Sequence, residues 1–347
     1  MGNNRTAAII GASGYSGAEL LRLIAHHPEI EIAFVTADSQ VGRDVGEIHP
    51  HLAVHYRGLI TRQLEAAARE ISSCDVVFVA LPHGESCKAY SLLRDSRLIV
   101  DLGGDFRLKD LQLYERWYGC SHAATENLSE WCYGLPEIFR AELSRTKRVA
   151  NPGCYATAII LAAAPLLAKQ LVKPQLTAIG LSGTSGAGKG LKENLHFSHA
   201  DENIYAYRVT DHQHTPEIEQ ALSVVYGGEV LVSFTPHVVP MTRGIYATLT
   251  VELEPGADAE AIQQAYQEQY QREPFVRLCA QPPMLKQVRG SNAAALHIST
   301  DIRLGRAVVT CAIDNLVKGA AGQALQNANL CLGLPETLGL PQLGFYP

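Results

Sequence analysis

The segment TAAIIGASGYSGAELLRLIAHHPEIEIAFVTA, residues 6–37, decides how the N-terminal half of the chain folds. Residues 6–10 form a short apolar run that ends at a glycine, which is typical of a buried strand. Residues 18–26 predict a helix, and residues 31–37 predict a second strand. A strand, a glycine-rich turn, a helix and a strand in this order predict a βαβ unit of a parallel sheet.

The turn between the first strand and the helix predicts a dinucleotide site. Gly11, Gly14 and Gly17 follow a G-x-x-G-x-x-G spacing, a variant of the commoner G-x-G-x-x-G pattern. Glycines permit a tight turn and a close approach of the backbone to a ligand, and a helix N-terminus attracts a pyrophosphate. Residues 75–81 and 98–102 predict further strands, and ligands bind at the carboxyl ends of such strands.

After Pro174 the pattern of the sequence changes. Strands are expected at residues 177–181, 230–234, 244–253 and 307–313, and helices at residues 257–270 and 316–330. We therefore predict an α/β fold in which a Rossmann-type nucleotide-binding domain precedes a second, α+β domain with a mixed or antiparallel sheet. The expected divisions are residues 1–153 for the nucleotide-binding domain, 154–315 for catalysis and oligomerisation, and 316–347 for a C-terminal helix that packs back on the first domain.

Composition excludes several classes of function. The 347 residues carry a net charge of −6 and no basic run, so we expect neither a nucleic acid nor a membrane as partner. Eight cysteines are dispersed without a C-x-x-C pair, which indicates reduced thiols and a cytoplasmic location. His212 and His214 have a spacing that could suit a metal, but no cysteine lies near them, so no metal site is expected.

Cys154 is the best candidate for a nucleophile. It follows the turn Asn151-Pro152-Gly153 and precedes the apolar run 156–164, which predicts a helix that begins at the cysteine. The positive end of the helix dipole favours the thiolate, and the thiolate is the reactive form. The alternative is a small buried residue that only packs at the start of a helix.

Residues 210–218 hold the best acid–base candidates. Pro216 and Glu217 mark the start of a helix, directly after His212 and His214. A histidine at a helix N-terminus can serve as a general acid or base near neutral pH. The alternative is a pair of solvated histidines in a loop.

The glycine-rich stretch at residues 182–189 resembles a phosphate-binding loop only in part. Gly183, Gly188 and Lys189 fit the G-x-x-x-x-G-K pattern, but Gly190 stands where a Ser or Thr should coordinate magnesium. The pattern therefore predicts either a loop whose backbone contacts a phosphate or a cofactor, or a mobile surface loop. It does not indicate a nucleoside triphosphatase.

Taken together, these motifs resemble those of the N-acetyl-γ-glutamyl-phosphate reductases of arginine biosynthesis. The motifs that carry the resemblance are GASGYSGAEL (11–20), LPHG (81–84), DFR (105–107), YGLPE (133–137), NPGCYAT (151–157), SGTSGAG (182–188), HQHTPEI (212–218), FTPH (234–237), RG (243–244) and DNLVKG (314–319). The resemblance implies that NADPH reduces N-acetyl-γ-glutamyl phosphate to N-acetylglutamate 5-semialdehyde and phosphate. It further implies a thioester on Cys154, His214 or His212 as acid–base, and a homo-oligomer, either a dimer or a tetramer.

The resemblance also assigns binding residues. Those expected at the NADP cofactor are Gly11, Ser13, Gly14, Tyr15, Ser16, Gly17, Ser39, Arg43, Pro82, Ser185, Gly186 and Asn315. Those expected at the substrate are Arg107, Arg243, Asn151 and Glu217, since arginine suits recognition of oxyanions. Asp38 fits an NAD enzyme, whereas Ser39 and Arg43 fit an NADP enzyme, and the resemblance favours NADP.

Other functions share part of this pattern. A related semialdehyde dehydrogenase that acts on aspartyl phosphate, or a reductase of acetyl-aminoadipyl phosphate, would have the same cysteine, histidine and cofactor loop. A Cys–His hydrolase or acyltransferase would explain Cys154 but leave the Gly11–Gly17 turn unused. In a nicotinamide sensor without catalysis, Cys154 would be incidental. Gln213 and Gly103-Gly104 depart from the pattern common in the reductases, which usually have Arg and Ser-Ala at these positions.

Overall fold

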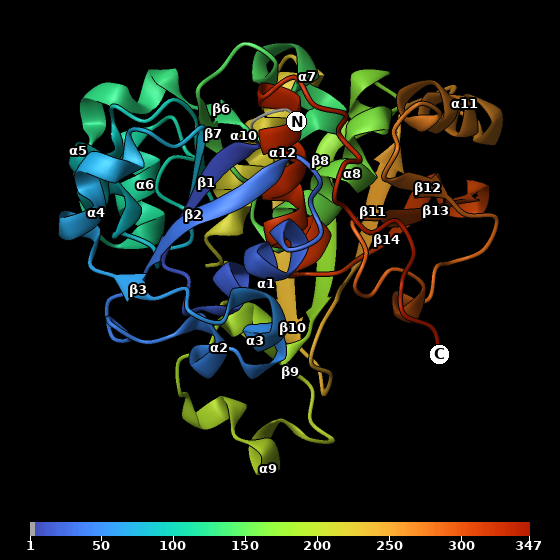
Figure 1. The fold of residues 1–347 in the computed structure, drawn as a ribbon. Coiled ribbons are helices and arrows are strands. Elements are labelled where there is room, and N and C mark those ends of the chain that lie inside the picture. The colour runs from blue at the N-terminus through green and yellow to red at the C-terminus, as the bar shows by residue number, and fades with distance from the viewer. Residues whose placement is uncertain (1–3) are drawn as a thin grey trace. The chain divides into compact units, whose positions relative to one another are not determined.

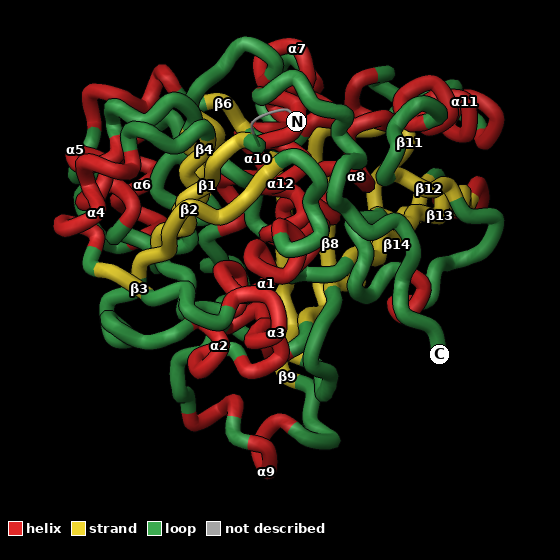
Figure 2. The backbone as a smooth tube through the Cα atoms, in the orientation of Figure 1, coloured by secondary structure: helices red, strands yellow, loops and turns green. Residues whose placement is uncertain are grey.

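The computed structural model describes residues 4–347, which divide into two compact units (Figure 1). The first unit comprises the chain up to Pro152 together with residues 320–340. The second unit comprises residues 153–319 together with residues 341–347. Figure 2 distinguishes the helices from the strands within each unit.

The sheet of the first unit is parallel throughout and has the strand order β3-β2-β1-β4-β5-β7-β6. Its strands are β1 (Arg5–Ile10), β2 (Ile30–Thr36), β3 (Thr61–Arg62), β4 (Val76–Val79), β5 (Ile99–Asp101), β6 (Cys132–Tyr133) and β7 (Arg148–Ala150). The chain runs outward from β1 in one direction through β2 and β3, and then in the other direction from β4. The order therefore reverses between β1 and β4, and ligands of such sheets bind beyond the carboxyl ends at this point.

Helices surround this sheet. They are α1 (Tyr15–Ile24), α2 (Val45–Ile48), α3 (Ala53–Tyr56), α4 (Leu64–Ile71), α5 (Ser86–Leu93), α6 (Leu111–Tyr118), α7 (Pro136–Leu143) and α12 (Gly322–Cys331), with 3-10 turns η1 (Pro50–Leu52) and η2 (Thr125–Glu130). α12 packs against both α1 and α7, although it comes from the far end of the chain. The first unit is thus completed by a helix that the chain supplies after the second unit.

The sheet of the second unit is mixed and has the order β12-β13-β14-β11-β8-β10-β9. Its strands are β8 (Val172–Ser182), β9 (Tyr205–Ala206), β10 (Leu231–Val238), β11 (Ile245–Leu253), β12 (Val276–Leu278), β13 (Ala294–Asp301) and β14 (Arg306–Ile313). Its helical elements are α8 (Cys154–Ala168), α9 (Phe197–Ala200), α10 (His214–Tyr226), α11 (Ala259–Tyr270) and the short turns η3 (Thr184–Ala187), η4 (Glu193–Leu195), η5 (Leu285–Gln287), η6 (Ile302–Leu304) and η7 (Val317–Ala321). A parallel sheet in one unit and a mixed sheet in the other confirm the predicted fold class.

One face of the second sheet is covered and the other is open. α8 packs against β8, β11 and β14, and α10 packs against β10. Residues of β8 alternate between buried and exposed, so that Leu176 and Ala178 face the helices whereas Thr177 and Ile179 face away. The open face carries an apolar residue at Ile179, which is 44% exposed.

α8 contains a proline that its neighbour α11 accommodates. Pro165 lacks the N–H that would bond the carbonyl of Leu161, four residues earlier. The hydroxyl of Tyr270 on α11 donates to this carbonyl oxygen at 2.7 Å, and the hydroxyl of Tyr266 donates to the carbonyl of Ala162. Since Tyr270 is buried, α11 supplies the hydrogen bond that the proline removes.

The last helix differs from its prediction. Residues 316–330 were expected to form one helix, but a π-turn occupies Val317–Ala321 and α12 follows only from Gly322. The Asp314 carboxylate accepts hydrogen bonds from the amides of Leu316 and Val317 and so fixes the start of this turn. Within residues 4–347, no helix combines the length and the apolar character needed to cross a bilayer.

Candidate active site

The glycine-rich turn after β1 has the geometry that a dinucleotide requires. Gly11 has a φ of +86°, and a Cβ there would lie 2.6 Å from the carbonyl oxygen of Ala80. A Cβ at Gly17 would lie 2.6 Å from the Cα of Ala12, so α1 packs directly on the turn. At Gly14, which precedes α1, the nearest atom would be 3.9 Å away. Two glycines therefore allow close packing, and the third leaves space for a phosphate at the helix N-terminus.

The loop after β2 contains the residues expected to choose between NADP and NAD. The Arg43 guanidinium donates to the Gln40 side chain at 2.6 Å and lies 3.6 Å from the Glu47 carboxylate. Both charged side chains of this pair are about half exposed, so water screens their attraction. Asp38 and Ser39 are exposed on the same loop.

Cys154 is the first residue of α8, as the sequence predicted. Gly153 precedes it with extended backbone angles, and the Gly153 carbonyl accepts from the amide and the hydroxyl of Thr157. A Cβ at Gly319 would lie 2.7 Å from the Cβ of Cys154. The half-buried thiol therefore lies at a helix N-terminus, against a backbone that only glycine allows.

The N-terminus of α10 meets the N-terminus of α8. His214 is the first residue of α10, and a Cβ at Gly153 would lie 2.3 Å from the His214 Nε2. The imidazole therefore lies directly on the residue before Cys154. Glu217, which is fully buried, accepts a hydrogen bond from the Gly153 amide at 2.8 Å. The fold thus brings Cys154, His214 and Glu217 together.

His212 is held by hydrogen bonding and by aromatic rings. Its Nδ1 accepts a hydrogen bond from the His214 amide at 3.1 Å, which places the proton of a neutral imidazole on Nε2. The rings of Tyr155, Tyr207 and Phe234 lie edge-on to His212 at centroid distances of 5.6, 5.6 and 5.3 Å. Such edge-to-face contacts fix the orientation of the imidazole.

Two tyrosines of this cluster were not predicted as site residues from the sequence. The Tyr155 hydroxyl donates to the His237 carbonyl at 3.0 Å, and burial raises the pKa of Tyr155 far above its ordinary value. Burial likewise raises the pKa of Tyr207 to about 12. Both therefore remain protonated at neutral pH. No local pattern singles out Tyr207, because its importance comes from the ring contact with His212.

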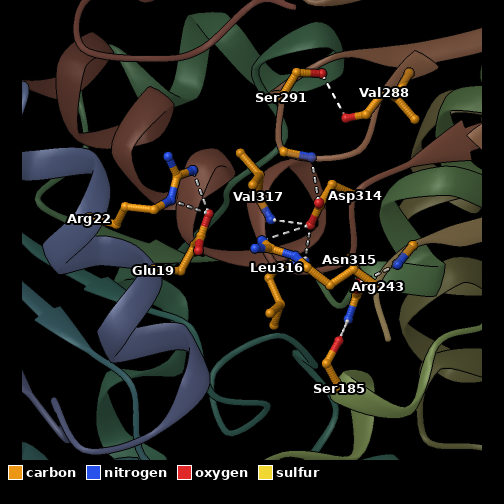
Figure 3. A network of polar contacts seen from close by, with 12 residues as sticks. Glu19, Arg22, Ser185, Arg243, Val288, Ser291, Asp314, Asn315, Leu316 and Val317 are labelled. Atoms are coloured by element: carbon orange, nitrogen blue, oxygen red, sulfur yellow. Dashed lines mark hydrogen bonds and ion pairs between the residues drawn. The ribbon is translucent and has the colours of Figure 1, made fainter. Parts of the chain in front are cut away.

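A polar network joins the loop at 182–188 to the end of β14 (Figure 3). The Asn315 side chain donates to the Ser185 hydroxyl at 2.9 Å and accepts from the Gly244 amide at 2.7 Å. The Arg243 guanidinium lies 3.1 Å from the Asp314 carboxylate, which also accepts from the Gly290 amide at 2.7 Å. The predicted cofactor residues Ser185 and Asn315 are thus in contact, and Arg243 is ion-paired.

Arg107 and Asn151 lie in the first unit and are both buried. The Arg107 guanidinium donates to the carbonyl of Asn151 at 2.8 Å and to that of Leu102 at 2.9 Å. The Asn151 side chain donates to the Ala320 carbonyl and accepts from Asn327. These contacts hold the backbone that leads into Cys154. Across residues 4–347, no cluster of three His, Cys, Asp or Glu side chains has the arrangement of a metal site.

Comparison with known proteins identifies the family to which this chain is similar. The family model described as semialdehyde dehydrogenase, NAD binding domain, matches residues 6–146, and the one described as semialdehyde dehydrogenase, dimerisation domain, matches residues 154–315. Among solved structures, aspartate semialdehyde dehydrogenase II of Vibrio cholerae, complexed with ASA, has a TM-score of 0.73 at 16% identity, over 96% of this chain and 99% of that one. Aspartate semialdehyde dehydrogenase of Candida albicans, with NADP, has a TM-score of 0.67 at 17% identity, over 95% and 98%.

The curated relatives are much more similar in sequence. N-acetyl-gamma-glutamyl-phosphate reductase of Pelotomaculum thermopropionicum is 47% identical over 98% of this chain and 99% of the relative. The protein of the same name from Acidothermus cellulolyticus is 49% identical over 98% of each chain. The fold and the two domain matches define an oxidoreductase of the semialdehyde dehydrogenase class. Within that class, the chain belongs to the N-acetyl-γ-glutamyl-phosphate reductase family, which confirms the resemblance noted in the sequence.

Proposed function

We propose that the protein reduces N-acetyl-γ-glutamyl phosphate to N-acetylglutamate 5-semialdehyde, with NADPH as hydride donor and phosphate as second product. The observation that carries this proposal is the contact of His214 Nε2 with Gly153, directly before the helix-terminal Cys154. It provides a nucleophile and a proton carrier at one place, as acyl transfer requires.

Cys154 carries the acyl group. Its thiolate attacks the acyl carbon, the bond between this carbon and the phosphate oxygen breaks, and a thioester forms. The α8 N-terminus stabilises the thiolate before the attack. The nicotinamide supplies a hydride to the thioester carbon when the cofactor is bound. Breakage of the C–S bond then restores the thiolate and releases the aldehyde.

His214 transfers the proton, and His212 holds His214 in position. When the thioester carbon accepts the hydride, negative charge develops on its oxygen, and a nearby donor lowers the energy of this state. His214 Nε2 shares a proton with that oxygen and takes it back when the C–S bond breaks. His212 accepts a hydrogen bond from the His214 amide, and its ring contacts those of Tyr155 and Tyr207. It therefore orients the start of α10.

The first unit supplies the main part of the cofactor site. The space at Gly14 and the N-terminus of α1 fit a pyrophosphate, with Gly11, Ser13, Tyr15, Ser16 and Gly17 around it. Ser39 and Arg43 would meet the 2′-phosphate that distinguishes NADP from NAD. Pro82 follows β4 at the point where the strand order reverses. In the second unit, Ser185, Gly186 and Asn315 would contribute contacts from the network of Figure 3.

Substrate anchoring is divided between cations and positioning groups. Arg243 would bind an oxyanion of the substrate while Asp314 holds its guanidinium. Arg107 and Asn151 support the backbone before Cys154, so their effect on the substrate would act through that segment. Glu217 would hold the two helix N-termini together through the Gly153 amide, besides any contact with substrate.

The division of labour and the assembly follow from the two units. The chain up to residue 153 would bind the cofactor, and residues 154–315 would carry catalysis and oligomerisation. We infer a homo-oligomer, a dimer or a tetramer, in which the open face of the second sheet is buried. The eight free cysteines favour a reducing, cytoplasmic compartment.

One assay tests the proposal. Loss of NADPH absorbance is followed separately with N-acetyl-γ-glutamyl phosphate, aspartyl phosphate and acetyl-aminoadipyl phosphate, and the three rates are compared. Rapid turnover of the first alone is expected. A preference for either of the others would assign the related reaction instead. Phosphate release without NADPH oxidation would indicate a hydrolase, and NADPH binding without turnover of any substrate would indicate a sensor.

A further inference from the structure

Arg208 lies in a strained turn that leads into the catalytic helix α10. Arg208 and Thr210 have φ angles of 45° and 62°, and the Asp211 amide donates to the Arg208 carbonyl at 3.1 Å. Residues other than glycine rarely adopt this left-handed conformation, and they keep it where their surroundings fix it. One anchor of the turn is the Tyr207 amide, which donates to the Pro236 carbonyl of β10 at 3.1 Å.

The guanidinium of Arg208 is held by a neutral group. It donates to the side-chain oxygen of Gln213, the residue between His212 and His214. Arg208 is exposed, and no carboxylate within residues 4–347 pairs with it. An arginine has five N–H donors, so most of those on Arg208 are available to a ligand. Its positive charge is also uncompensated.

Arg208 and Cys154 act on the same tyrosine. The pKa of Tyr207 is raised to about 12, mainly by burial; the Cys154 sulfur raises it further, whereas the positive charge of Arg208 lowers it. The Tyr207 ring in turn lies 5.6 Å from that of His212. The cation, the nucleophile and the histidine pair therefore belong to one neighbourhood of the second unit.

Arg243, the other arginine of this unit that is expected at the substrate, differs from Arg208 because it is paired with a carboxylate. Arg243 lies 3.1 Å from Asp314, whose buried carboxylate offsets its charge. The substrate of the proposed reaction carries a carboxylate and a phosphate, and burial of two anionic groups requires cationic partners. Arg208 provides a cation that no carboxylate of the described residues 4–347 neutralises.

We propose that Arg208 is an anion-binding residue of the substrate site, oriented by Gln213 so that its guanidinium holds an oxyanion of the substrate beside His214. This inference rests on the proposed function. The planar guanidinium binds a carboxylate or a phosphate through two parallel N–H donors, which a lysine cannot reproduce.

The reverse reaction distinguishes the two oxyanions, because the aldehyde and phosphate are then separate substrates. Steady-state kinetics with N-acetylglutamate 5-semialdehyde, inorganic phosphate and NADP⁺ are compared for wild type and Arg208→Gln. We expect one KM to rise roughly ten- to a hundredfold, as for one lost charge-assisted contact, with kcat changed by no more than a few-fold. A rise for the aldehyde identifies the carboxylate as the bound group, and a rise for phosphate identifies the phosphate.

Further variants separate binding from folding. Adding Gln213→Arg to Arg208→Gln returns a guanidinium to the same contact pair, and it should recover much of the lost affinity. Arg208→Lys keeps the charge without the fork and should recover little. Arg272→Gln removes another exposed arginine of the second unit and should leave each KM unchanged.

The inference is overturned if wild type turns over and Arg208→Gln leaves the KM of both aldehyde and phosphate unchanged. It is also overturned if the KM of NADP⁺ rises equally, or if Gln213→Arg restores nothing while the melting temperature has fallen. Absence of turnover in wild type would contradict the proposed function itself.

Discussion

At the scale of single residues, the covalent step of the proposed reaction depends on the sulfur of Cys154. Cys154→Ala should abolish turnover, and Cys154→Ser should be nearly as poor, because an alkoxide forms far less readily than a thiolate. Binding of NADPH, measured by its fluorescence, should stay within a few-fold of wild type.

Iodoacetamide should inactivate the enzyme by alkylating Cys154, and bound substrate should protect this residue. Cys120 serves as control, since it is more exposed and lies in the first unit, away from α8 in the sequence. Inactivation that followed labelling of Cys120 would refute the assignment.

The two histidines should differ in their effects on the rate. His214→Asn removes the proton carrier, so kcat should fall by about 10²–10⁴-fold. His212→Asn keeps a short polar side chain that can still accept from the His214 amide, so its loss of rate should be smaller. The comparison is made from pH profiles of kcat. Equal losses in both variants, or a normal rate in His214→Asn, would contradict the division of roles.

At the scale of elements, α8 depends on α11. Tyr270→Phe removes the hydroxyl that donates to the Leu161 carbonyl, which Pro165 leaves without its helical partner. A buried carbonyl without a donor should lower the free energy of unfolding by about 1–3 kcal/mol. Urea denaturation measures the change. Tyr226→Phe on α10 is a matched control, because its side chain is not buried; equal loss in both would argue against this explanation.

The loop after β2 should set the choice of cofactor. Arg43→Ala removes a cation that would meet the 2′-phosphate, so the KM of NADPH should rise about tenfold whereas that of NADH should change little. Both cofactors are compared in wild type and variant. Arg57→Ala, another exposed arginine of the first unit, is the control. A wild-type preference for NADH, or equal losses with both cofactors, would show that Asp38 governs the loop.

At the scale of the whole molecule, the open face of the second sheet is the expected contact between copies. Ile179 lies on this face beside Thr248 of β11, to which it is paired. Ile179→Asp places a charge there, and burial of an unpaired charge is costly, so the oligomer should dissociate. Light scattering of the purified protein measures its mass. Ile302→Asp, at an exposed residue on η6 outside the strands, should leave the mass unchanged. An unaltered mass in Ile179→Asp would place the contact elsewhere.

Local sequence determined much of this protein. The apolar run before Gly11 and the glycine spacing after it predicted the first βαβ unit, and the turn before Cys154 predicted a thiol at a helix start. Such features follow from backbone geometry and periodicity within a few residues. Short strands such as β6 and β9 were missed, because two residues carry no measurable period. The π-helical segment at Val317 was also missed, and the Asp314 side chain caps its start.

Only the tertiary structure decided how the distant parts of the site meet. Glu217 accepts from Gly153 across 64 residues, and Asn315 donates to Ser185 across 130 residues. Periodicity cannot encode such contacts, since they arise where the packing of α8, α10 and the sheet leaves room for one side chain. The same packing pairs Arg243 with Asp314 and leaves Arg208 to a neutral glutamine. The sequence therefore determined which chemical groups are present, and the packing determined their partners.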